Sequence, residues 1–394
     1  MNVELEVLRI AHGGVSVAEL DGRVVFVADT LPGERVLARI SDEAHDRFWR
    51  AETLRVLRPS PDRQAHVWDA ASIDRPPELR AGGAELGHVA PGRQRALKEQ
   101  VLRDALQRTG GLTEQEVQHL GAAVRAVPGR ADGTRSRTRL RLHVDEDGRA
   151  GPYAARSRTV VPVADLPLAV EGLEALLPRR AAGRTLDLVA SAGGAFAASG
   201  RRDHGPIVER AGGREFALEA LGFWQVHPAA AETLQQAVRD ALAPDFDPAA
   251  DNLDLYGGVG LLAAALAGAG GRSTRVTTVE SDAAATGHAA RNLADLPHVR
   301  ATTARVDRFL ARPRRRPGAT VVLDPPRSGA GADVVRALAA AEPARIVYVA
   351  CDPVALARDL KTFGGLGWRP TRLEAFDLFP NTHHLEAVAA LERG

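Results

Sequence analysis

The sequence predicts an α/β protein: a small β-barrel at the N-terminus, a central α+β region, and a doubly wound, Rossmann-like parallel sheet at the C-terminus. Two patterns indicate this. Residues 1–58 alternate apolar and polar positions between turn residues, which is typical of short strands. From about Phe216, apolar strand-like runs alternate with Ala- and Leu-rich helical segments, as in a parallel sheet covered by helices. We therefore expect three parts, at residues 1–58, 59–215 and 216–394.

The N-terminal part contains five short strand patterns separated by Gly, Asp-Gly and Pro-Gly turns. Five such strands favour a small closed barrel of the oligonucleotide-binding type. Barrels of this kind either bind RNA or serve as structural modules, and the pattern alone leaves both roles open. A Pro-rich break at Arg58–Arg63 marks the end of the barrel.

The central part is irregular at first and then shows helical periodicity over Ala90–Arg108. Two strand patterns follow around an Asp-Gly turn. Their alternation would place four arginines on one strand face: Arg135, Arg137, Arg139 and Arg141. That face is either solvated or a stripe that contacts phosphates, and the sequence favours neither reading.

Composition excludes several classes of protein. A net charge of +1 predicts no particular partner. The single cysteine, Cys351, excludes an intramolecular disulfide, a Cys-rich zinc site and a Cys-ligated iron–sulfur cluster. No run approaches the roughly 20 apolar residues of a membrane span. The N-terminus carries acidic residues where a secretory signal has basic ones, so we expect a cytoplasmic protein.

Two strand patterns in the C-terminal part end in residues suited to a nucleoside cofactor. A glycine-rich stretch, Asp254–Gly260, lies between a strand and a helix, where glycines allow a ligand to approach the backbone closely. The next strand ends in Glu280, about 20 residues further on, the usual place for an acid that binds ribose hydroxyls.

The two strands that follow end in more reactive residues. One runs into Asp324-Pro-Pro-Arg327, which indicates a rigid loop over the sheet edge. The other runs into Cys351-Asp-Pro353. A lone cysteine is often an inert core residue, but one at the carboxyl edge of a sheet is well placed to be a nucleophile.

The last motif contains His383, His384 and Glu386. In a strand the two histidines would point apart, and no third ligand is evident, so we expect no metal site here. General-base or orienting roles fit these side chains better.

Together these motifs resemble the RNA uracil-C5 methyltransferases that act on tRNA and 23S rRNA. The resemblance rests on five motifs in order: FWQVH at 223–227, DLYGGVG, VVLDPPRSG, IVYVACDP and DLFPNTHHLEAV. It implies a class I methyltransferase fold that uses S-adenosyl-L-methionine, with the barrel as a TRAM domain. It also implies an RNA substrate, either rRNA or tRNA, no metal, and a reaction that a monomer can carry out.

The resemblance further implies roles for individual residues. Cys351 would be the nucleophile that adds to uracil C6, and Glu386 the base that removes the C5 proton. Arg327 would shape the uracil pocket. Five residues would contact the cofactor: Gln225, Tyr256, Gly258, Glu280 and Asp324.

The chain departs from the family pattern after the barrel. Many members place four cysteines there to hold an iron–sulfur cluster, whereas Arg63–Gly92 contains none. We therefore expect the cluster to be absent and apolar or Pro-rich packing to take its place.

Two alternatives remain to be weighed against uridine methylation. The first is methylation of another RNA base. Exocyclic-amine enzymes carry an aromatic residue where Arg327 stands, and cytosine-C5 enzymes on RNA generally use two cysteines. The second is a non-catalytic RNA-binding protein on the same scaffold. Loss of Cys351 or Glu386 would indicate that, and both are present.

Overall fold

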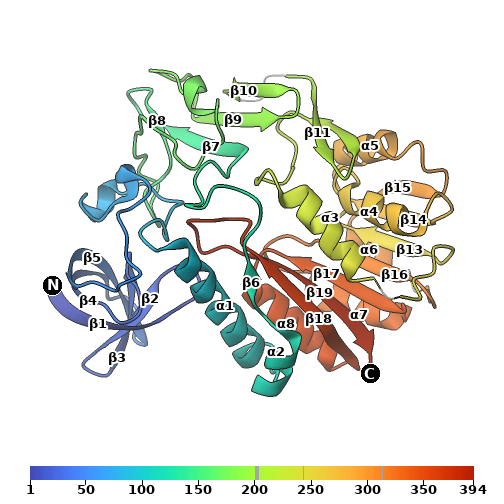
Figure 1. Ribbon diagram of the computed structural model, residues 1–394, viewed down its shortest axis with the longest axis horizontal. Coiled ribbons are helices and arrows are strands. Elements are labelled where there is room, and N and C mark those ends of the chain that lie inside the picture. The colour runs from blue at the N-terminus through green and yellow to red at the C-terminus, as the bar shows by residue number, and fades with distance from the viewer. Residues whose placement is uncertain (200–203, 243, 313) are drawn as a thin grey trace.

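The computed structural model describes residues 1–199, 204–242, 244–312 and 314–394, and it confirms the predicted α/β fold with an N-terminal barrel (Figure 1). The barrel strands close in the order β1-β2-β3-β5-β4. They are β1 (Asn2–Ile10), β2 (Ser16–Leu20), β3 (Arg23–Ala28), β4 (Arg35–Asp42) and β5 (Phe48–Arg58). Alternate residues point inward, so that Leu5, Val7, Val25 and Val27 form an apolar barrel core.

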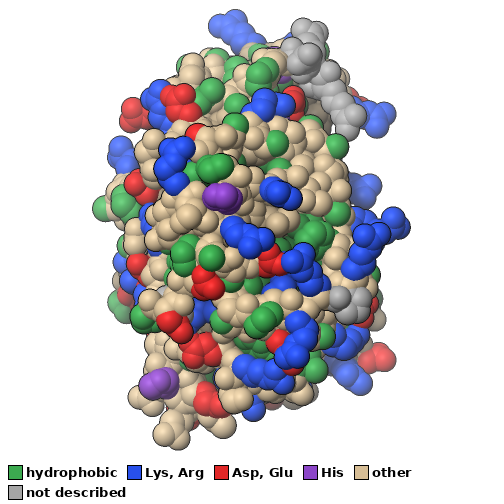
Figure 2. Space-filling view, turned by 90° about the vertical axis from the view of Figure 1, so that its right-hand side faces the viewer, with side chains coloured by type: hydrophobic (Ala, Val, Ile, Leu, Met, Phe, Trp, Pro, Cys, Tyr) green, Lys and Arg blue, Asp and Glu red, His purple; other side chains and the backbone are tan. Residues whose placement is uncertain are grey.

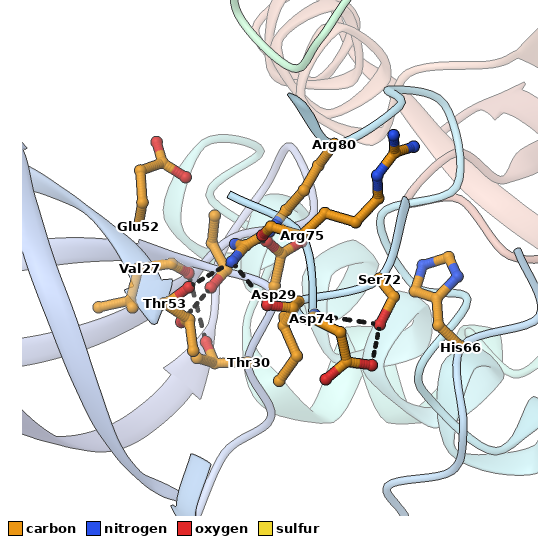
Figure 3. A network of polar contacts seen from close by, with 12 residues as sticks. Val27, Asp29, Thr30, Glu52, Thr53, His66, Ser72, Asp74, Arg75 and Arg80 are labelled. Atoms are coloured by element: carbon orange, nitrogen blue, oxygen red, sulfur yellow. Dashed lines mark hydrogen bonds and ion pairs between the residues drawn. The ribbon is translucent and has the colours of Figure 1, made fainter. Parts of the chain in front are cut away.

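The segment between the barrel and the first α-helix contains the short 3-10 helices η1 (Asp69–Ala71) and η2 (Pro77–Leu79). Trp68 and Ala70 pack into an apolar cluster, in line with the expectation of apolar packing. A buried arginine, which the sequence did not predict, also organises this segment. The Arg80 guanidinium donates to Asp29 Oδ2 at 2.8 Å and to the Thr53 carbonyl oxygen at 2.8 Å (Figure 3). Apolar packing is thus only part of what orders this segment, which lacks the four cysteines of an iron–sulfur cluster.

The predicted helix is present as α1 (Pro91–Arg108), followed by α2 (Glu114–Leu120) and β6 (Val124–Arg125). These elements join the C-terminal core, because β6 pairs in parallel with β18 and α1 contacts α8. The chain therefore contributes a strand to the C-terminal sheet well before residue 216. The division into three parts at residues 1–58, 59–215 and 216–394 remains a prediction.

A second, smaller sheet has the strand order β10-β9-β7-β8. Its strands are β7 (Arg139–Val144), β8 (Ala150–Gly151), β9 (Thr185–Ser191) and β10 (Gly194–Ala198), with η3 (Glu174–Leu176) between β8 and β9. The hairpin of β11 (Pro206–Ala211) and β12 (Arg214–Glu219) connects this sheet to the C-terminal part.

The expectation that four arginines share one strand face is wrong, because β7 begins only at Arg139. Arg135 has a left-handed φ of 54°, and its guanidinium bonds to Glu174. Arg137 donates to the Gly83 carbonyl oxygen. Arg139 and Arg141 do lie on one strand, but they pair with Glu209 and Asp187 respectively. All four arginines therefore hold parts of the protein together.

The C-terminal sheet has eight strands in the order β15-β14-β13-β16-β17-β19-β18-β6 (Figure 1). Its remaining strands are β13 (Asn252–Leu255), β14 (Val276–Glu280), β15 (Val299–Thr303), β16 (Thr320–Leu323), β17 (Arg345–Ala350), β18 (Trp368–Phe376) and β19 (Glu386–Arg393). The helices are α3 (Ala230–Asp240), α4 (Leu261–Gly270), α5 (Ala283–Asn292), α6 (Val306–Leu310), α7 (Ala332–Ala341) and α8 (Pro353–Gly364).

Two apolar cores lie on opposite faces of this sheet. Successive strand residues point to opposite faces, so Ile346 and Tyr348 join one core and Val347 and Val349 the other. Helices α1, α6, α7 and α8 cover the first face, and α3, α4 and α5 the second. The sheet is thereby buried on both sides, and only the ends of its strands are free to form a site.

The molecular face on the side of α5 and β15 carries basic and acidic side chains intermixed (Figure 2). Ion pairs in this part of the chain, such as Arg214 with Asp295 and Arg275 with Asp251, follow from that mixture. Although the chain is rich in arginine, this face of the molecule is therefore not uniformly basic.

Candidate active site

Cys351 and Glu386 lie opposite each other at the carboxyl edge of the sheet. Strand β17 ends at Ala350, whose cross-strand partner on β19 is Ala387. The register continued by one residue sets Cys351 against Glu386. Residues directly opposite on antiparallel strands have Cα atoms about 4.5–5.5 Å apart and side chains on the same face. Glu386 is buried and Cys351 half-buried.

Asp324 adds a second carboxyl to this pair. It follows β16, the parallel neighbour of β17. Burial, and then the charges of Glu386 and Asp324, raise the pKa of the Cys351 thiol to about 12, whereas the Arg327 cation acts in the opposite direction. Burial and Asp324 likewise raise the pKa of Glu386 well above its usual value. Three acidic groups thus share one site, and ionisation of any one disfavours ionisation of the others.

Backbone N–H groups of the loop between β13 and α4 hold this loop against β14. The Gly258 N–H donates to Glu280 Oε2 at 3.2 Å, which joins the glycine-rich loop to the end of β14. Gly257 lies so close to its neighbours that a Cβ there would be 1.9 Å from Thr278 Oγ1. Tyr256 has a φ of 63°, a conformation that residues other than glycine seldom adopt.

Asp254 supports this loop from beneath. Its Oδ2 atom accepts hydrogen bonds from the Ala263 N–H at 3.1 Å and the Thr278 hydroxyl at 2.9 Å. Its Oδ1 atom is buried and has no hydrogen-bond partner among the described residues. Burial raises the pKa of Asp254 to about 6, and burial together with Asp254 raises that of Asp324 to about 7.

The loop after Asp324 is fixed by Asp359 of α8. Its Oδ2 atom accepts from the Tyr348 hydroxyl at 2.7 Å and from the Ala330 N–H at 2.7 Å. Arg327, between these anchors and Asp324, is exposed. Its guanidinium is therefore available to a ligand while its backbone is held.

The loop before β19 is tied to α1 by buried polar contacts. Lys98 Nζ lies 2.5 Å from Asp377 Oδ1 and donates to the Phe379 carbonyl oxygen at 3.0 Å. Gln94 Nε2 donates to Asn381 Oδ1 at 2.9 Å. These contacts fix the segment that leads directly into Glu386.

The two histidines of this loop do not point apart. They precede β19 and are not part of a strand, and their ring centroids lie 3.9 Å apart. His383 Nδ1 pairs with Glu85, whereas burial and the neighbouring His383 lower the pKa of His384 to about 3. The expectation based on strand geometry was wrong because the chain turns before it pairs.

Gln225 is buried in the segment before α3. Within the described ranges, no hydrogen bond links its side chain to the other predicted site residues. The structure thus brings Cys351, Glu386, Asp324 and Arg327 into one group and joins Gly258 to Glu280, but Gln225 lies on a separate segment.

Comparisons with known proteins match the C-terminal part to a methyltransferase family, and full-length relatives extend this similarity to nearly the whole chain. Residues 226–394 match the model of the tRNA (Uracil-5-)-methyltransferase family. The chain is 39% identical to an uncharacterized RNA methyltransferase of Streptomyces coelicolor, over 99% of this chain and 92% of the relative. It is 31% identical to the 23S rRNA (uracil(1939)-C(5))-methyltransferase RlmD of Halomonas elongata, over 99% of this chain and 89% of the relative.

The chain belongs to the RNA uracil-C5 methyltransferase family. Its fold is similar to that of the Pyrococcus abyssi tRNA (uracil-54, C5)-methyltransferase, solved in complex with S-adenosyl-L-homocysteine. The TM-score is 0.71 at 21% identity, and the match covers 98% of this chain and 99% of that one.

Members of this family use S-adenosyl-L-methionine, and the residues at the strand ends fit that cofactor. The glycine-rich loop offers open space above Gly258, where a Cβ would meet nothing within 4 Å. The unpaired Oδ1 atom of Asp254 and the carboxylate of Glu280 are hydrogen-bond acceptors, the type of group that binds hydroxyl and amino groups. In the described residues, no group of three His, Cys, Asp or Glu side chains could hold a metal ion, and no helix is both long and apolar enough to cross a membrane.

The sequence reasoning missed Asp254 as a site residue. An aspartate between Leu253 and Leu255, inside a strand that must be buried on both faces, was the available signal. A charged residue in such a strand needs hydrogen-bond partners, and these are the Ala263 N–H at the start of α4 and the Thr278 hydroxyl of β14.

Proposed function

We propose that this protein methylates C5 of a uridine in RNA through a covalent adduct between Cys351 and uracil C6. The observation that carries this is the register of β17 with β19, which sets a thiol against a buried carboxyl beside Asp324. The 31% identity to a 23S rRNA enzyme and the fold shared with a tRNA enzyme leave ribosomal and transfer RNA as the two substrate classes.

The cofactor would be held by Gln225, Tyr256, Gly258, Glu280 and Asp324. When bound there, S-adenosyl-L-methionine supplies an electrophilic methyl group on a positive sulfonium, and a positive charge lowers the pKa of a neighbouring thiol. Arg327 acts on the thiol in the same direction.

Cys351 supplies the activation that uracil lacks. Its thiolate Sγ forms a bond to C6, and the π electrons of the C5–C6 double bond move onto C5 and O4 as an enolate. C5 is then nucleophilic enough to take up the methyl group, whose bond to the sulfonium sulfur would break and leave that sulfur neutral. The target base must leave its stack to reach this position, as other base-modifying enzymes require.

Glu386 completes the turnover. The methylated adduct still carries a proton on C5, and the Glu386 carboxylate accepts that proton. The electrons of the C5–H bond restore the C5–C6 double bond, the Sγ–C6 bond breaks, and the thiolate is regenerated. A carboxylate with a raised pKa is a stronger proton acceptor than an ordinary one, which suits Glu386 to this step.

Methyl transfer from labelled cofactor into undermethylated RNA tests the proposal. We expect label in 5-methyluridine, in either the rRNA or the tRNA fraction. The Cys351→Ser variant should be inactive, and Glu386→Gln should accumulate a covalent protein–RNA adduct that survives denaturing electrophoresis. Asp333→Asn, a change at an exposed helix position, is the matched control. Label in another nucleoside, or normal turnover by either site variant, would refute the assignment.

A further inference from the structure

A histidine of the barrel reaches the residue next to Cys351. His12 lies in the turn between β1 and β2, and its Nε2 atom is 3.0 Å from Asp352 Oδ2. The two residues are 340 positions apart in the sequence, and neither is among the predicted site residues. This contact therefore links the barrel directly to the loop that carries the cysteine.

Asp352 uses its two carboxylate oxygens for different purposes. Oδ1 accepts hydrogen bonds from the backbone N–H groups of Val354 at 3.0 Å and Ala355 at 2.8 Å, which caps the N-terminus of α8. Oδ2 faces His12. Because both oxygens are engaged, the Asp352 side chain is held in one orientation, by α8 on one side and by His12 on the other. These contacts fix the backbone directly after Cys351.

The turn that carries His12 packs closely against the rest of the site. Gly14 has a φ of 74°, and a Cβ on it would lie 2.8 Å from Glu85 Cγ and 3.0 Å from His383 Cβ. The rings of His12 and His383 are 6.2 Å apart, and His383 in turn pairs with Glu85. His12 is thus faced by Asp352 of α8, by His383 of the loop before β19, and through it by Glu85.

We propose that His12 is a positioning residue for methyl transfer: through Asp352 it holds the loop after β17 so that Cys351 stays opposite Glu386. The inference rests on the proposed roles of Cys351 and Glu386. It makes correct docking of the barrel a requirement for full catalytic rate, independent of any RNA contact that the barrel makes.

The contact depends on pH in a defined direction. The hydrogen bond to Asp352 raises the pKa of His12 above its ordinary value of 6.5, against the effect of burial. Burial alone would raise the pKa of Asp352, but His12 and the α8 amides hold it below its usual range. His12 therefore keeps its charge below pH 6.5, where Asp352 stays ionised down to its own lowered pKa, and loses that charge as pH rises through the raised pKa of His12.

The test uses four variants and two readouts. His12→Ala removes the contact, and His12→Gln keeps a neutral hydrogen-bond donor. Gly14→Ala forces the turn away from Glu85 and His383. His45→Gln is the control, because His45 is an exposed barrel histidine stacked on Phe48, with ring centroids 4.4 Å apart. The readouts are single-turnover methyl transfer and alkylation of Cys351 by iodoacetamide, which reports on the only cysteine of the chain.

A half-exposed ion pair shifts an equilibrium by up to about fivefold. At about pH 6.5 we expect His12→Ala to slow methyl transfer about three- to fivefold, with little change in KM for RNA, and to speed alkylation of Cys351 by a similar factor. Gly14→Ala should act in the same direction, His12→Gln should recover part of the rate, and His45→Gln should match the wild type. At about pH 8.5 the wild type should approach His12→Gln.

Wild-type methyl-transfer rates and alkylation rates in His12→Ala would overturn the inference. A rise in KM alone would also overturn it, since that result would make His12 an RNA contact. Failure of the proposed function is separate: it would appear as a wild-type protein that forms neither 5-methyluridine nor an adduct. Alkylation needs no RNA, so an unchanged alkylation rate in His12→Ala rejects the positioning role even in that case.

Discussion

The environment of Cys351 keeps its thiol protonated in the free protein. A thiol pKa of about 12 leaves only a very small thiolate fraction near neutral pH, and two carboxyl groups beside it work against ionisation. As the proposed nucleophile, Cys351 would thus be unreactive until positive charge and the substrate enter the site. For a protein that carries its only cysteine in an accessible loop, this reduces unwanted oxidation and alkylation.

Replacement of a neighbouring carboxyl should therefore make the thiol more reactive. In Glu386→Gln we expect the pKa of Cys351 to fall, and alkylation at about pH 8 to proceed several-fold faster than in the wild type. The pH dependence of alkylation, followed by mass spectrometry, measures this. Asp333→Asn, at an exposed position in the first turn of α7, serves as the control. A rate in Glu386→Gln at or below that of the wild type would contradict the account.

At the scale of elements, the glycine-rich loop owes its shape to close contact with β14. Gly257 leaves no room for a side chain, because Thr278 Oγ1 and Asp254 Oδ2 occupy the space that a Cβ would fill. The backbone at this position cannot hold a larger residue unless Thr278 or Asp254 moves.

A Gly257→Ala change should consequently displace the loop. We expect the affinity for S-adenosyl-L-methionine to fall about tenfold or more, because a shift of the loop N–H groups removes the close approach that glycine permits. Calorimetric titration measures it. Gly268→Ala is the matched control, since that glycine lies within α4 and a Cβ there meets nothing within 4 Å. The control should bind the cofactor normally and gain about 0.5–1 kcal/mol of unfolding free energy.

Local patterns were enough to predict the elements and the strand-end residues. The alternation of residues 1–58 predicted the barrel, and apolar runs ending in Asp324 or Cys351 predicted the sheet edge, because both signals lie within a few neighbouring residues. Local patterns could not predict the partners of Arg135 and Arg137, the pairing of His383 with Glu85, or the contact of His12 with Asp352. Each depends on segments tens to hundreds of residues apart, and one sequence contains no record of such pairs.

At the scale of the whole molecule, two of the arginines at the boundary between the barrel and the following segment have very different surroundings. Arg80 is buried and contacts Asp29 and Thr53 of the barrel (Figure 3), whereas Arg39 of the barrel reaches Glu78 at the surface. A buried partner without its counter-ion is costly, but an exposed ion pair is nearly neutral. Docking of the barrel thus depends on Arg80 far more than on Arg39.

Arg80→Ala should destabilise the protein by about 3 kcal/mol, because Asp29 and the Thr53 carbonyl oxygen lose their donor inside the structure. Urea unfolding followed by circular dichroism measures the change. Arg39→Ala, which removes a contact across the same boundary, should leave the unfolding midpoint where it is. Equal effects of the two substitutions would show that burial is not what gives Arg80 its importance.

The place of β19 between β17 and β18 has a consequence for how the enzyme comes into being. Glu386 is the first residue of β19, so the proposed base and the proposed nucleophile meet only when this last strand has paired with β17 and β18, both of which precede it in the chain. During translation, the barrel and most of the sheet leave the ribosome first, while the chain still lacks the proposed proton acceptor. A nascent chain paused at this stage could bind cofactor and RNA but could not release a methylated base. Completion of the sheet is therefore the last folding step that turnover requires. In a circular permutant that begins at β18, the strands β18 and β19 would be synthesised first, so Glu386 would be present before Cys351.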